Sequence, residues 1–206
     1  MSTAPAIDAA AERSELVRTA LEMAREAHAG QVRNASGGRP YIDHPVAVAA
    51  QLVEHGLSDE VLAAALLHDV VEDSELETED IRIAAGDRVA EIVATLTDDE
   101  SIESYEDRKA EHRARVEAAG PDAQAVYVAD KLTNVEMLRD AYSDQGEQVG
   151  EELTVSLDEK VAVWEADLAM IVENAGGEAA VAALAERLAD QLNSLRADRA
   201  ATAPPS

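Results

Sequence analysis

The apolar part of this sequence contains almost no aromatic side chains, and this shortage restricts the folds that the chain can adopt. Hydrophobic residues make up 47% of the 206 residues, aromatic residues make up only 2%, and phenylalanine is absent. A core must therefore be built from Ala, Val, Leu and Ile, which suits closely packed helices. A chain of this length can bury one sizeable core. We expect a single all-α domain, a bundle of about eight to ten helices.

Apolar spacing and capping residues divide much of the chain into helical segments. Apolar residues recur at helical spacing over residues 14–27, and Gly30 follows just past the end of that stripe. Pro45 stands at a first-turn position, and Gly56 closes the segment that it opens. The segment after Ser58 is apolar on nearly every face, which is typical of a helix buried at the centre of a domain.

Composition changes along the chain and indicates where the domain begins and ends. Residues 1–12 and 199–206 are rich in Ala, Ser and Pro with little periodicity, so we expect frayed ends there. The helical domain is therefore assigned to residues 13–198. The stretch 104–118 is nearly all charged, which predicts a helix exposed to solvent, with His112 in contact with water.

Acidic residues outnumber basic residues by 43 to 17, which gives a net charge of −26. Such a surface repels nucleic acid and acidic membranes, which argues against a nucleic acid duplex or a membrane as a partner. No segment approaches the roughly 20 apolar residues of a membrane span, and the first residues lack a signal-peptide pattern. We therefore expect a cytoplasmic protein and leave its oligomeric state open. Only three basic residues are lysines, at Lys109, Lys131 and Lys160.

The stretch LLHDVVED, residues 66–73, places ionisable groups inside an otherwise apolar helical pattern. Side chains advance by about 100° per residue along a helix, so one face can hold His68, Asp69, Glu72 and Asp73. Burying such carboxylates together costs on the order of several kcal/mol per ion unless a cation or a protonation change compensates. A divalent metal ion would compensate this charge. Imidazole and carboxylate donors, in a chain without cysteine, suit Mn, Fe, Mg or Zn.

One helix cannot surround an ion, so other segments must contribute ligands. His44 is a candidate because it stands immediately before Pro45 at the start of a helical segment. Asp130 is a second candidate, in the stretch YVADKLTN, where apolar residues flank it. Asn134 lies four positions further on and should share the inward face of that helix.

These motifs, taken in order, resemble those of a known family. HP, then HDVVED, then ADKLTN resemble the HD-domain phosphohydrolases, and more narrowly the hydrolase domain of the RelA/SpoT family. The flanking stretches AREAHAGQVR, GGRPYIDHPVAVA and VADKLTNVEML are similar to that family's motifs, and LTDDESI is similar to the free-standing small alarmone hydrolases of the MESH1 type. The resemblance covers residues 16–142 and implies that the helical bundle is a single HD domain.

The resemblance also implies how the ionisable residues divide their roles. One Mn²⁺ ion would be held by four side chains: His44, His68, Asp69 and Asp130. Glu72 and Asp73 would position or deprotonate the attacking water. A bound divalent ion lowers the pKa of a water and polarises a phosphoryl oxygen, and a nearby carboxylate can accept the proton.

A substrate and its contacts follow from the same resemblance. The family removes the 3′ pyrophosphate from the guanosine alarmones pppGpp and ppGpp and returns GTP or GDP. Arg33 is the expected phosphate clamp, because a guanidinium fork matches phosphate oxygens. Asn134 would contact the nucleotide, and Tyr41 would line the site with its hydroxyl available to a ligand.

Two positions depart from the family pattern and leave alternatives open. Asn34 stands where the family usually has a lysine after the loop arginine, and Tyr127 stands where it usually has a lysine three residues before the metal-binding aspartate. Both changes remove positive charge from the expected path of a polyanion. One alternative is therefore an HD phosphohydrolase of another phosphorylated nucleotide, such as NADPH. The other is a nucleotide sensor without catalysis, which the pair Glu72 and Asp73 argues against.

Overall fold

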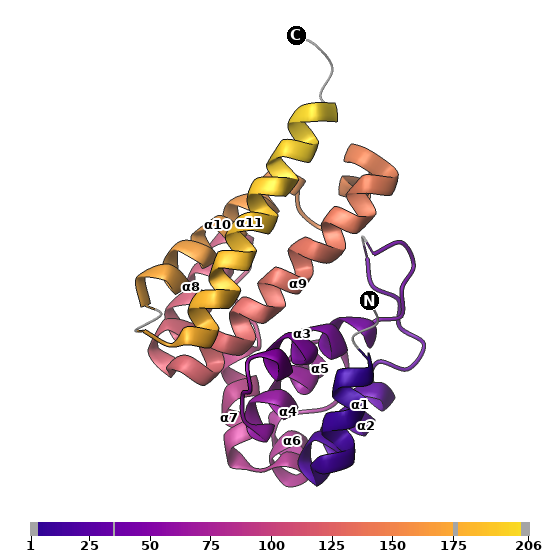
Figure 1. Cartoon of the computed structure of the whole chain (residues 1–206), viewed down its shortest axis with the longest axis vertical. Coiled ribbons are helices and arrows are strands. Elements are labelled where there is room, and N and C mark those ends of the chain that lie inside the picture. Colours follow the sequence, from indigo (N-terminus) through magenta and orange to yellow (C-terminus); the bar gives the residue numbers. More distant parts are fainter. Residues whose placement is uncertain (1–3, 35, 175–176, 203–206) are drawn as a thin grey trace.

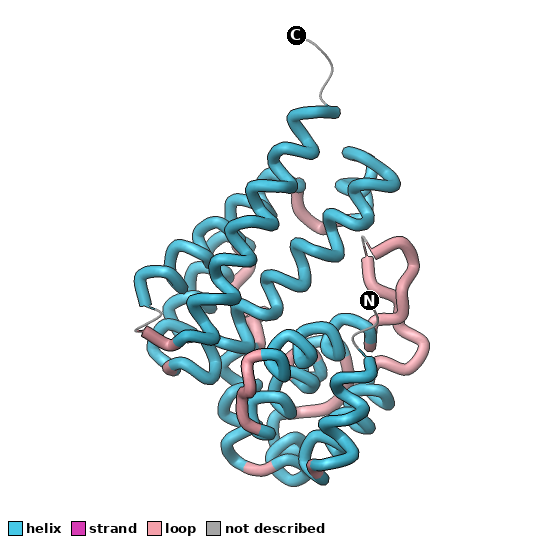
Figure 2. The backbone as a smooth tube through the Cα atoms, in the orientation of Figure 1, coloured by secondary structure: helices cyan, strands magenta, loops and turns pink. Residues whose placement is uncertain are grey.

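The fold is all-α in the computed structural model, which describes residues 4–34, 36–174 and 177–202. The helices follow one another along the chain as α1 (Ala4–Arg13), α2 (Glu15–Ala27), α3 (Asp43–Glu54), α4 (Asp59–Leu67), α5 (Val70–Asp73), α6 (Thr78–Ala85), α7 (Asp87–Leu96), α8 (Tyr105–Ala119), α9 (Pro121–Gln145), the 3-10 helix η1 (Gly146–Glu152), α10 (Leu157–Asn174) and α11 (Ala179–Thr202). These residues include no strand (Figure 2). Val32 and Pro40 form one isolated antiparallel bridge in the loop before α3. The all-α prediction is confirmed.

Two groups of helices make up the molecule (Figure 1). The long helices α9 and α11 lie side by side with α8 and α10, whereas α1 to α7 gather at the other end. α4 lies between the groups, because it packs against α2, α3 and α7 and also against α9. Every residue from Val61 to Leu67 is buried, which confirms that α4 is a central helix. The end of α4 therefore lies in the interior, beside α3 and α9.

Side-chain caps set the start of several helices. Ser14, Ser58 and Ser104 each accept a hydrogen bond from a backbone N–H in the first turn of the helix that follows. Such a cap satisfies one of the N–H groups that the first turn leaves without a partner. Pro121 opens α9 directly after Gly120, whose φ of 89° few other residues adopt. The capped start of α4 fixes the register that brings its last turn to the interior.

The amino-terminal segment differs from the frayed end that its composition predicts. Residues 4–13 form α1, which packs against α2 and α3. Ile7 is fully buried and Ala10 is 3% exposed, so α1 covers apolar surface of the core. The alanines for which we expected a frayed end are strong helix formers. Packing against the core supplies the stability that so short a helix lacks on its own.

The carboxyl-terminal boundary also lies further along the chain than the sequence indicates. α11 continues to Thr202 instead of ending before residue 199. Arg199 in this last turn donates to Glu147 at 2.9 Å and to Asp158 at 2.7 Å. These ion pairs tie the end of α11 to η1 and α10. Residues 203–206 of the expected tail lie outside the described residues.

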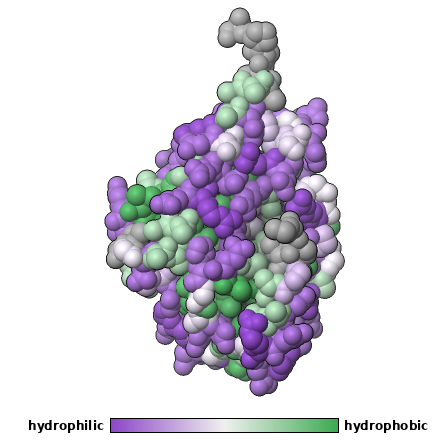
Figure 3. All heavy atoms as spheres, viewed as in Figure 1, coloured by the Kyte–Doolittle hydropathy of each residue, from purple (hydrophilic) through white to green (hydrophobic). Residues whose placement is uncertain are grey.

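Hydrophilic residues predominate on the molecular face in Figure 3, where apolar residues form separate patches. Among the described residues, large apolar side chains with high exposure are Val32, Ile83 and Val172. None of the helices in the described part of the chain has the length and hydropathy that crossing a bilayer requires.

The docking of α1 can be tested by truncating its buried side chain. Ile7→Ala is expected to lower the free energy of unfolding by about 2–5 kcal/mol, because it leaves a cavity in the core. The matched control is Ile83→Ala, which removes the same atoms from a side chain that is 78% exposed and should change stability by less than about 0.5 kcal/mol. Urea unfolding measures both values. Equally small effects would show that α1 is detached in solution.

Candidate metal centre

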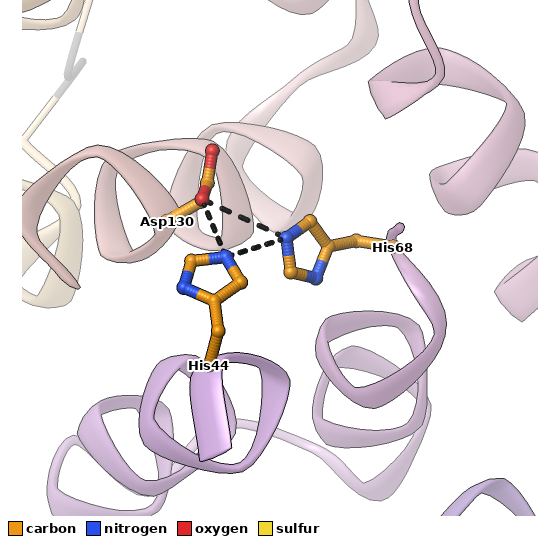
Figure 4. Close-up of side chains that lie close together, drawn as sticks. All are labelled: His44, His68 and Asp130. Atoms are coloured by element: carbon orange, nitrogen blue, oxygen red, sulfur yellow. Dashed lines mark hydrogen bonds and ion pairs between the residues drawn. The ribbon is translucent and has the colours of Figure 1, made fainter. Parts of the chain in front are cut away.

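Three helical segments bring two imidazoles and a carboxylate together (Figure 4). His44 lies in the first turn of α3, His68 follows the last residue of α4, and Asp130 lies in the middle of α9. The two Nε2 atoms are 3.3 Å apart, and Asp130 Oδ1 lies 3.0 Å from His44 Nε2 and 3.6 Å from His68 Nε2. These residues, predicted from three distant motifs, form one cluster that could hold a metal ion.

The helix that the sequence predicts through residues 66–73 is interrupted at its centre. α4 ends at Leu67, His68 and Asp69 form a turn, and α5 covers only Val70–Asp73. His68 and Asp69 keep right-handed helical backbone dihedrals in this turn. Asp69 Oδ1 lies 3.1 Å from His68 Nε2, and Oδ2 lies 3.6 Å from His44 Nε2. Asp69 therefore contacts both imidazoles.

Hydrogen bonds orient the donor atoms of the cluster. The Nδ1 atom of His68 lies 2.8 Å from the carbonyl oxygen of Ala65, which can only accept, so Nδ1 carries a proton. This bond directs Nε2 of His68 toward His44 and Asp130 and suits it to metal ligation. Asp130 is held by Lys131 Nζ, 2.7 Å from Oδ2, and by Asn134 Nδ2, 2.7 Å from Oδ1. The ligand atoms of His68 and Asp130 are thus oriented by neighbouring groups.

Charges within the cluster already require a cation. Burial lowers the pKa of His44 to about 4. Burial also opposes the charged form of His68, but Asp69 and Asp130 outweigh it and raise the pKa of His68 to about 9. Despite burial, neighbouring cations hold the pKa of Asp69 below its usual value and that of Asp130 well below it, with Lys131 acting most strongly on Asp130. A divalent ion could take over the role of this positive charge.

The two acidic residues after the cluster lie in different surroundings. Glu72 accepts a hydrogen bond from the backbone N–H of Asp98 at 2.6 Å. Partial burial by the surrounding protein, followed by the charge of Asp69, raises the pKa of Glu72 to about 7, and Glu72 is nevertheless an exposed residue, like Asp73. Glu72 lines a cavity of about 230 Å³ that also contains His68, Asp69 and Asp130. Asp73 is exposed and lines only the adjoining outer pocket of about 380 Å³.

Arg33, Tyr41 and Asn134, the predicted substrate contacts, form one wall of both pockets. Arg33 donates to Asn134 Oδ1, and its guanidinium lies 5.0 Å from the centre of the Tyr41 ring. Tyr41 in turn donates to Asp69 at 2.9 Å. The wall is therefore connected to the cluster through hydrogen bonds at both Asp69 and Asp130.

Asp98, Lys109 and His112 form an ionic cluster beside Glu72, here called the Asp98 hub, which the sequence did not indicate. Asp98 accepts a hydrogen bond from Lys109 Nζ at 2.5 Å and lies 2.8 Å from His112 Nδ1. His112 is only 3% exposed, so its predicted contact with water is wrong. Its polar helix hides one buried face, where His112 packs edge-on against the ring of Tyr127 at 5.2 Å. The hub fixes the backbone N–H that binds Glu72.

The lysines offer the signal that could have pointed to these residues. All three lysines of the sequence line the same inner cavity, at Lys109, Lys131 and Lys160. A chain that otherwise uses arginine for positive charge keeps lysine for this cavity. The two positions that depart from the family pattern also lie here, with Tyr127 in the inner cavity and Asn34 in the outer pocket.

Fold and site together define an all-α protein with a candidate divalent-metal centre of His and Asp ligands. The donor set fits such an ion, because imidazole and carboxylate groups surround one point and no thiolate is available. The family model for the HD domain matches residues 20–155, and the chain belongs to this family.

Individual relatives agree with this assignment. The chain is 31% identical over 158 residues to a guanosine-3′,5′-bis(diphosphate) 3′-pyrophosphohydrolase of Aquifex aeolicus, an alignment that covers 74% of this chain and 22% of that protein. It is 40% identical over 121 residues to the human pyrophosphohydrolase MESH1, covering 56% of this chain and 65% of MESH1. The chain thus spans about a fifth of the length of its Aquifex relative.

Solved structures show the same likeness in three dimensions. The structure of a metazoan ortholog of SpoT that hydrolyses ppGpp superimposes with a TM-score of 0.70 at 28% identity, covering 88% of this chain and 96% of that one. The structure of lmo0812 from Listeria monocytogenes gives a TM-score of 0.67 at 31% identity, covering 77% of this chain and 96% of that one.

Loss of one imidazole should abolish metal binding. His68→Ala removes a ligand atom from the centre of the cluster and is expected to weaken divalent-metal affinity by more than about 100-fold. His55→Ala, which truncates a histidine at the end of α3 outside the cluster, should retain the metal. Metal analysis after gel filtration, with calorimetric titration of Mn²⁺, measures both. Stoichiometric binding by His68→Ala would contradict the ligand set.

The Asp98 hub should make stability depend on pH. Lys109 and His112 outweigh burial and lower the pKa of Asp98, so its stabilisation is present above about pH 4 and is lost as pH falls below that value. Asp98→Ala should therefore cost roughly 3–5 kcal/mol at pH 7, with the difference from wild type shrinking toward pH 2. Asp140→Ala breaks an exposed pair with Arg39 and should cost less than about 1 kcal/mol. Urea unfolding at several pH values measures this, and a constant difference would contradict it.

Proposed function

We propose that this protein is a metal-dependent phosphohydrolase that removes the 3′ pyrophosphate of ppGpp and pppGpp and returns GDP or GTP. The observation that carries the proposal is the convergence of His44, His68, Asp69 and Asp130 on one point, with Glu72 beside them in a cation-lined cavity. Relatives that are 31% and 40% identical to the chain are named guanosine-3′,5′-bis(diphosphate) 3′-pyrophosphohydrolases. Mn²⁺ is the proposed ion, held by those four ligands.

Each residue has a physical task in this reaction. A divalent ion held by His44, His68, Asp69 and Asp130 would supply Lewis-acid chemistry, lowering the pKa of a water and polarising a phosphoryl oxygen. Glu72 accepts the proton of the attacking water, and its pKa of about 7 suits a general base near neutral pH. The backbone N–H of Asp98 holds the Glu72 carboxylate in place. Asp73, at the edge of the outer pocket, positions the water from the solvent side.

Arg33 has the geometry of a phosphate clamp. Its guanidinium is held between Asn134 and the ring of Tyr41, and one of its nitrogens lies 3.7 Å from Asp69 Oδ2. This pre-ordered position lets the guanidinium fork bind phosphate oxygens next to the metal centre at little cost in conformational entropy. Asn134 and Tyr41 act in the proposal as contacts that hold Arg33 and line the nucleotide path.

A second candidate is hydrolysis of another phosphorylated nucleotide such as NADPH. Asn34 favours it, because an amide lines the outer pocket where the family usually has a lysine. The replacement of the family's lysine by Tyr127 is weaker support for this candidate. The ammonium of Lys131 lies 4.4 Å over the Tyr127 ring and supplies a cation nearby. The metal centre would serve either substrate.

A substrate panel separates these candidates. Purified protein with Mn²⁺ is incubated with ppGpp, pppGpp and NADPH, and the products are identified by chromatography and mass spectrometry. If the proposal is correct, ppGpp and pppGpp are hydrolysed and the products are pyrophosphate together with GDP or GTP. Turnover of NADPH alone would replace it with the second candidate. If nothing turns over while nucleotide still binds, the protein is a sensor.

The general base is tested by a charge-neutral substitution. Glu72→Gln should retain the metal but lower kcat by about 10²–10⁴-fold, because the amide cannot accept the proton. Glu75→Gln, an exposed neighbour outside both pockets, should leave kcat unchanged. Stopped-time assays with bound-metal analysis measure each variant. Full activity in Glu72→Gln would refute its role.

Asp73 is tested in the same assay. Asp73→Asn should retain metal and lose most turnover if its carboxylate positions the water. Unchanged activity would remove Asp73 from the mechanism and leave Glu72 as the sole acidic group acting on water.

A further inference from the structure

His28 is a buried polar residue that lies outside both pockets. It is the residue that ends α2, and it is only 2% exposed. Neither His28 nor Gln31, three residues further on, lines the inner cavity or the outer pocket. Any effect of these two residues on the metal centre must therefore pass through the residues that they contact.

Hydrogen bonds join His28 to Gln31 and determine where the imidazole carries its proton. The Nε2 atom of Gln31 donates to the carbonyl oxygen of Ala27 at 3.4 Å and to that of Asp73 at 2.7 Å. The amide oxygen of Gln31 therefore faces His28 Nδ1, 2.8 Å away. Because this oxygen can only accept, Nδ1 carries the proton and holds the Gln31 side chain in place.

The imidazole of His28 stacks on Tyr41, which reaches the metal centre. The centroids of the two rings are 4.6 Å apart, and their planes differ by 16°. The backbone N–H of Tyr41 also donates to the carbonyl oxygen of Gln31 at 3.0 Å. The hydroxyl at the far end of the Tyr41 ring donates to Asp69 at 2.9 Å. The stack and the backbone bond thus fix the ring that orients a proposed metal ligand.

Gln31 also holds the end of α5. This helix has four residues, so its last carbonyl groups find no partner within the helix. Gln31 supplies a donor to the carbonyl oxygen of Asp73, the last residue of α5. Glu72 and Asp73, the acidic pair of the proposed reaction, both lie on this short helix. The pair of His28 and Gln31 therefore contacts both Tyr41 and the segment that carries the acidic pair.

Histidine at this position lowers stability in one respect. The Nε2 atom of His28 is buried and has no hydrogen-bond partner among the described residues. A buried polar atom without a partner is unfavourable, and an apolar ring would avoid this loss. The contacts of the imidazole with Gln31 and Tyr41 offset it, which favours a role for those contacts beyond packing.

We propose that His28 and Gln31 are positioning residues for the metal centre. His28 holds the Tyr41 ring so that its hydroxyl orients Asp69, and Gln31 holds the end of α5. One hydrogen-bonded unit thus aligns a metal ligand with the acidic pair that acts on water. The role of His28 concerns metal affinity alone, whereas the role of Gln31 in turnover rests on the proposed function.

A double-mutant cycle tests the role of His28 without requiring activity. Calorimetric titration of Mn²⁺ measures the affinity of wild type, His28→Ala, Tyr41→Phe and the double variant. Tyr41→Phe loses only the hydroxyl and should weaken Mn²⁺ binding by about 10- to 100-fold, because that hydroxyl orients a metal ligand. His28→Ala should weaken binding by about 10-fold alone and cause no further loss in the Tyr41→Phe background, because His28 acts through that hydroxyl.

Two further variants separate positioning from folding. His28→Phe keeps a flat ring against Tyr41 and should bind Mn²⁺ nearly as tightly as wild type, whereas an affinity as low as that of His28→Ala would refute the stacking contact. His28→Asn, which also lacks the ring, takes the place of His28→Ala in the cycle if the alanine variant does not fold.

Three outcomes of the cycle would overturn the inference. The first is an equal loss from the histidine substitution in both backgrounds, because a general effect on the fold does not depend on the Tyr41 hydroxyl. The second is an unchanged affinity in either single variant. The third is absence of Mn²⁺ binding by the wild-type protein.

Turnover tests the role of Gln31. Gln31→Ala removes the donor to the Asp73 carbonyl and should lower kcat for ppGpp by about 10- to 100-fold with little change in KM, because it displaces groups that act in the transition state. Gln124→Ala is the matched control, since this glutamine also donates to a backbone carbonyl, that of Glu117, and lines neither pocket. It should leave kcat unchanged. A rise in KM without a fall in kcat, or no change in either, would refute the role of Gln31.

The two experiments keep this inference separate from the proposed function. If the wild-type protein hydrolyses no nucleotide, the proposed function fails, and the role of Gln31 in turnover fails with it. The Mn²⁺ cycle still decides the role of His28, since it needs no substrate. Hydrolysis of ppGpp without coupling between His28 and Tyr41 would uphold the proposed function and overturn the positioning role of His28.

Discussion

Burial of two imidazoles and two carboxylates around one point is the constraint on which the rest of this structure depends. Asp69 and Asp130 lie within 3.6 Å of the imidazoles of His44 and His68, in an interior where unpaired charge is costly. The proton on His68 and the ammonium of Lys131 balance part of that charge. The remaining donor atoms have the chemistry and the convergence that a divalent ion requires.

Packing of apolar helices holds these groups in register. α4 is buried from Val61 to Leu67, and its contacts with α3 and α9 bring the three ligand-bearing segments to one place. The Asp98 hub extends this rigid frame to Glu72, since Lys109 and His112 fix the segment whose backbone binds that carboxylate. Glu72 is therefore positioned by a loop segment that the ion pairs of Asp98 hold in place.

Much of the fold and the metal centre could be predicted from sequence, because both depend on local patterns. The apolar run after Ser58 identified the central helix, and His44, His68 and Asp130 stood in short motifs with strong spacing. The hub could not be predicted in this way. Asp98 and His112 are separated from each other by a loop and lie on polar stretches, where only tertiary contact distinguishes a buried charge from a solvated one.

The sequence by itself determined the helical class, the ligand types and the acidic surface, since propensity, donor chemistry and net charge are properties of the residues alone. Tertiary structure decided which charges lose water. It docked α1 instead of leaving it frayed, brought Asp69 within contact distance of the imidazoles of His44 and His68, and gathered all three lysines around one cavity. The physical reason is that desolvation and charge pairing depend on distance in space, which the order of residues along the chain does not fix.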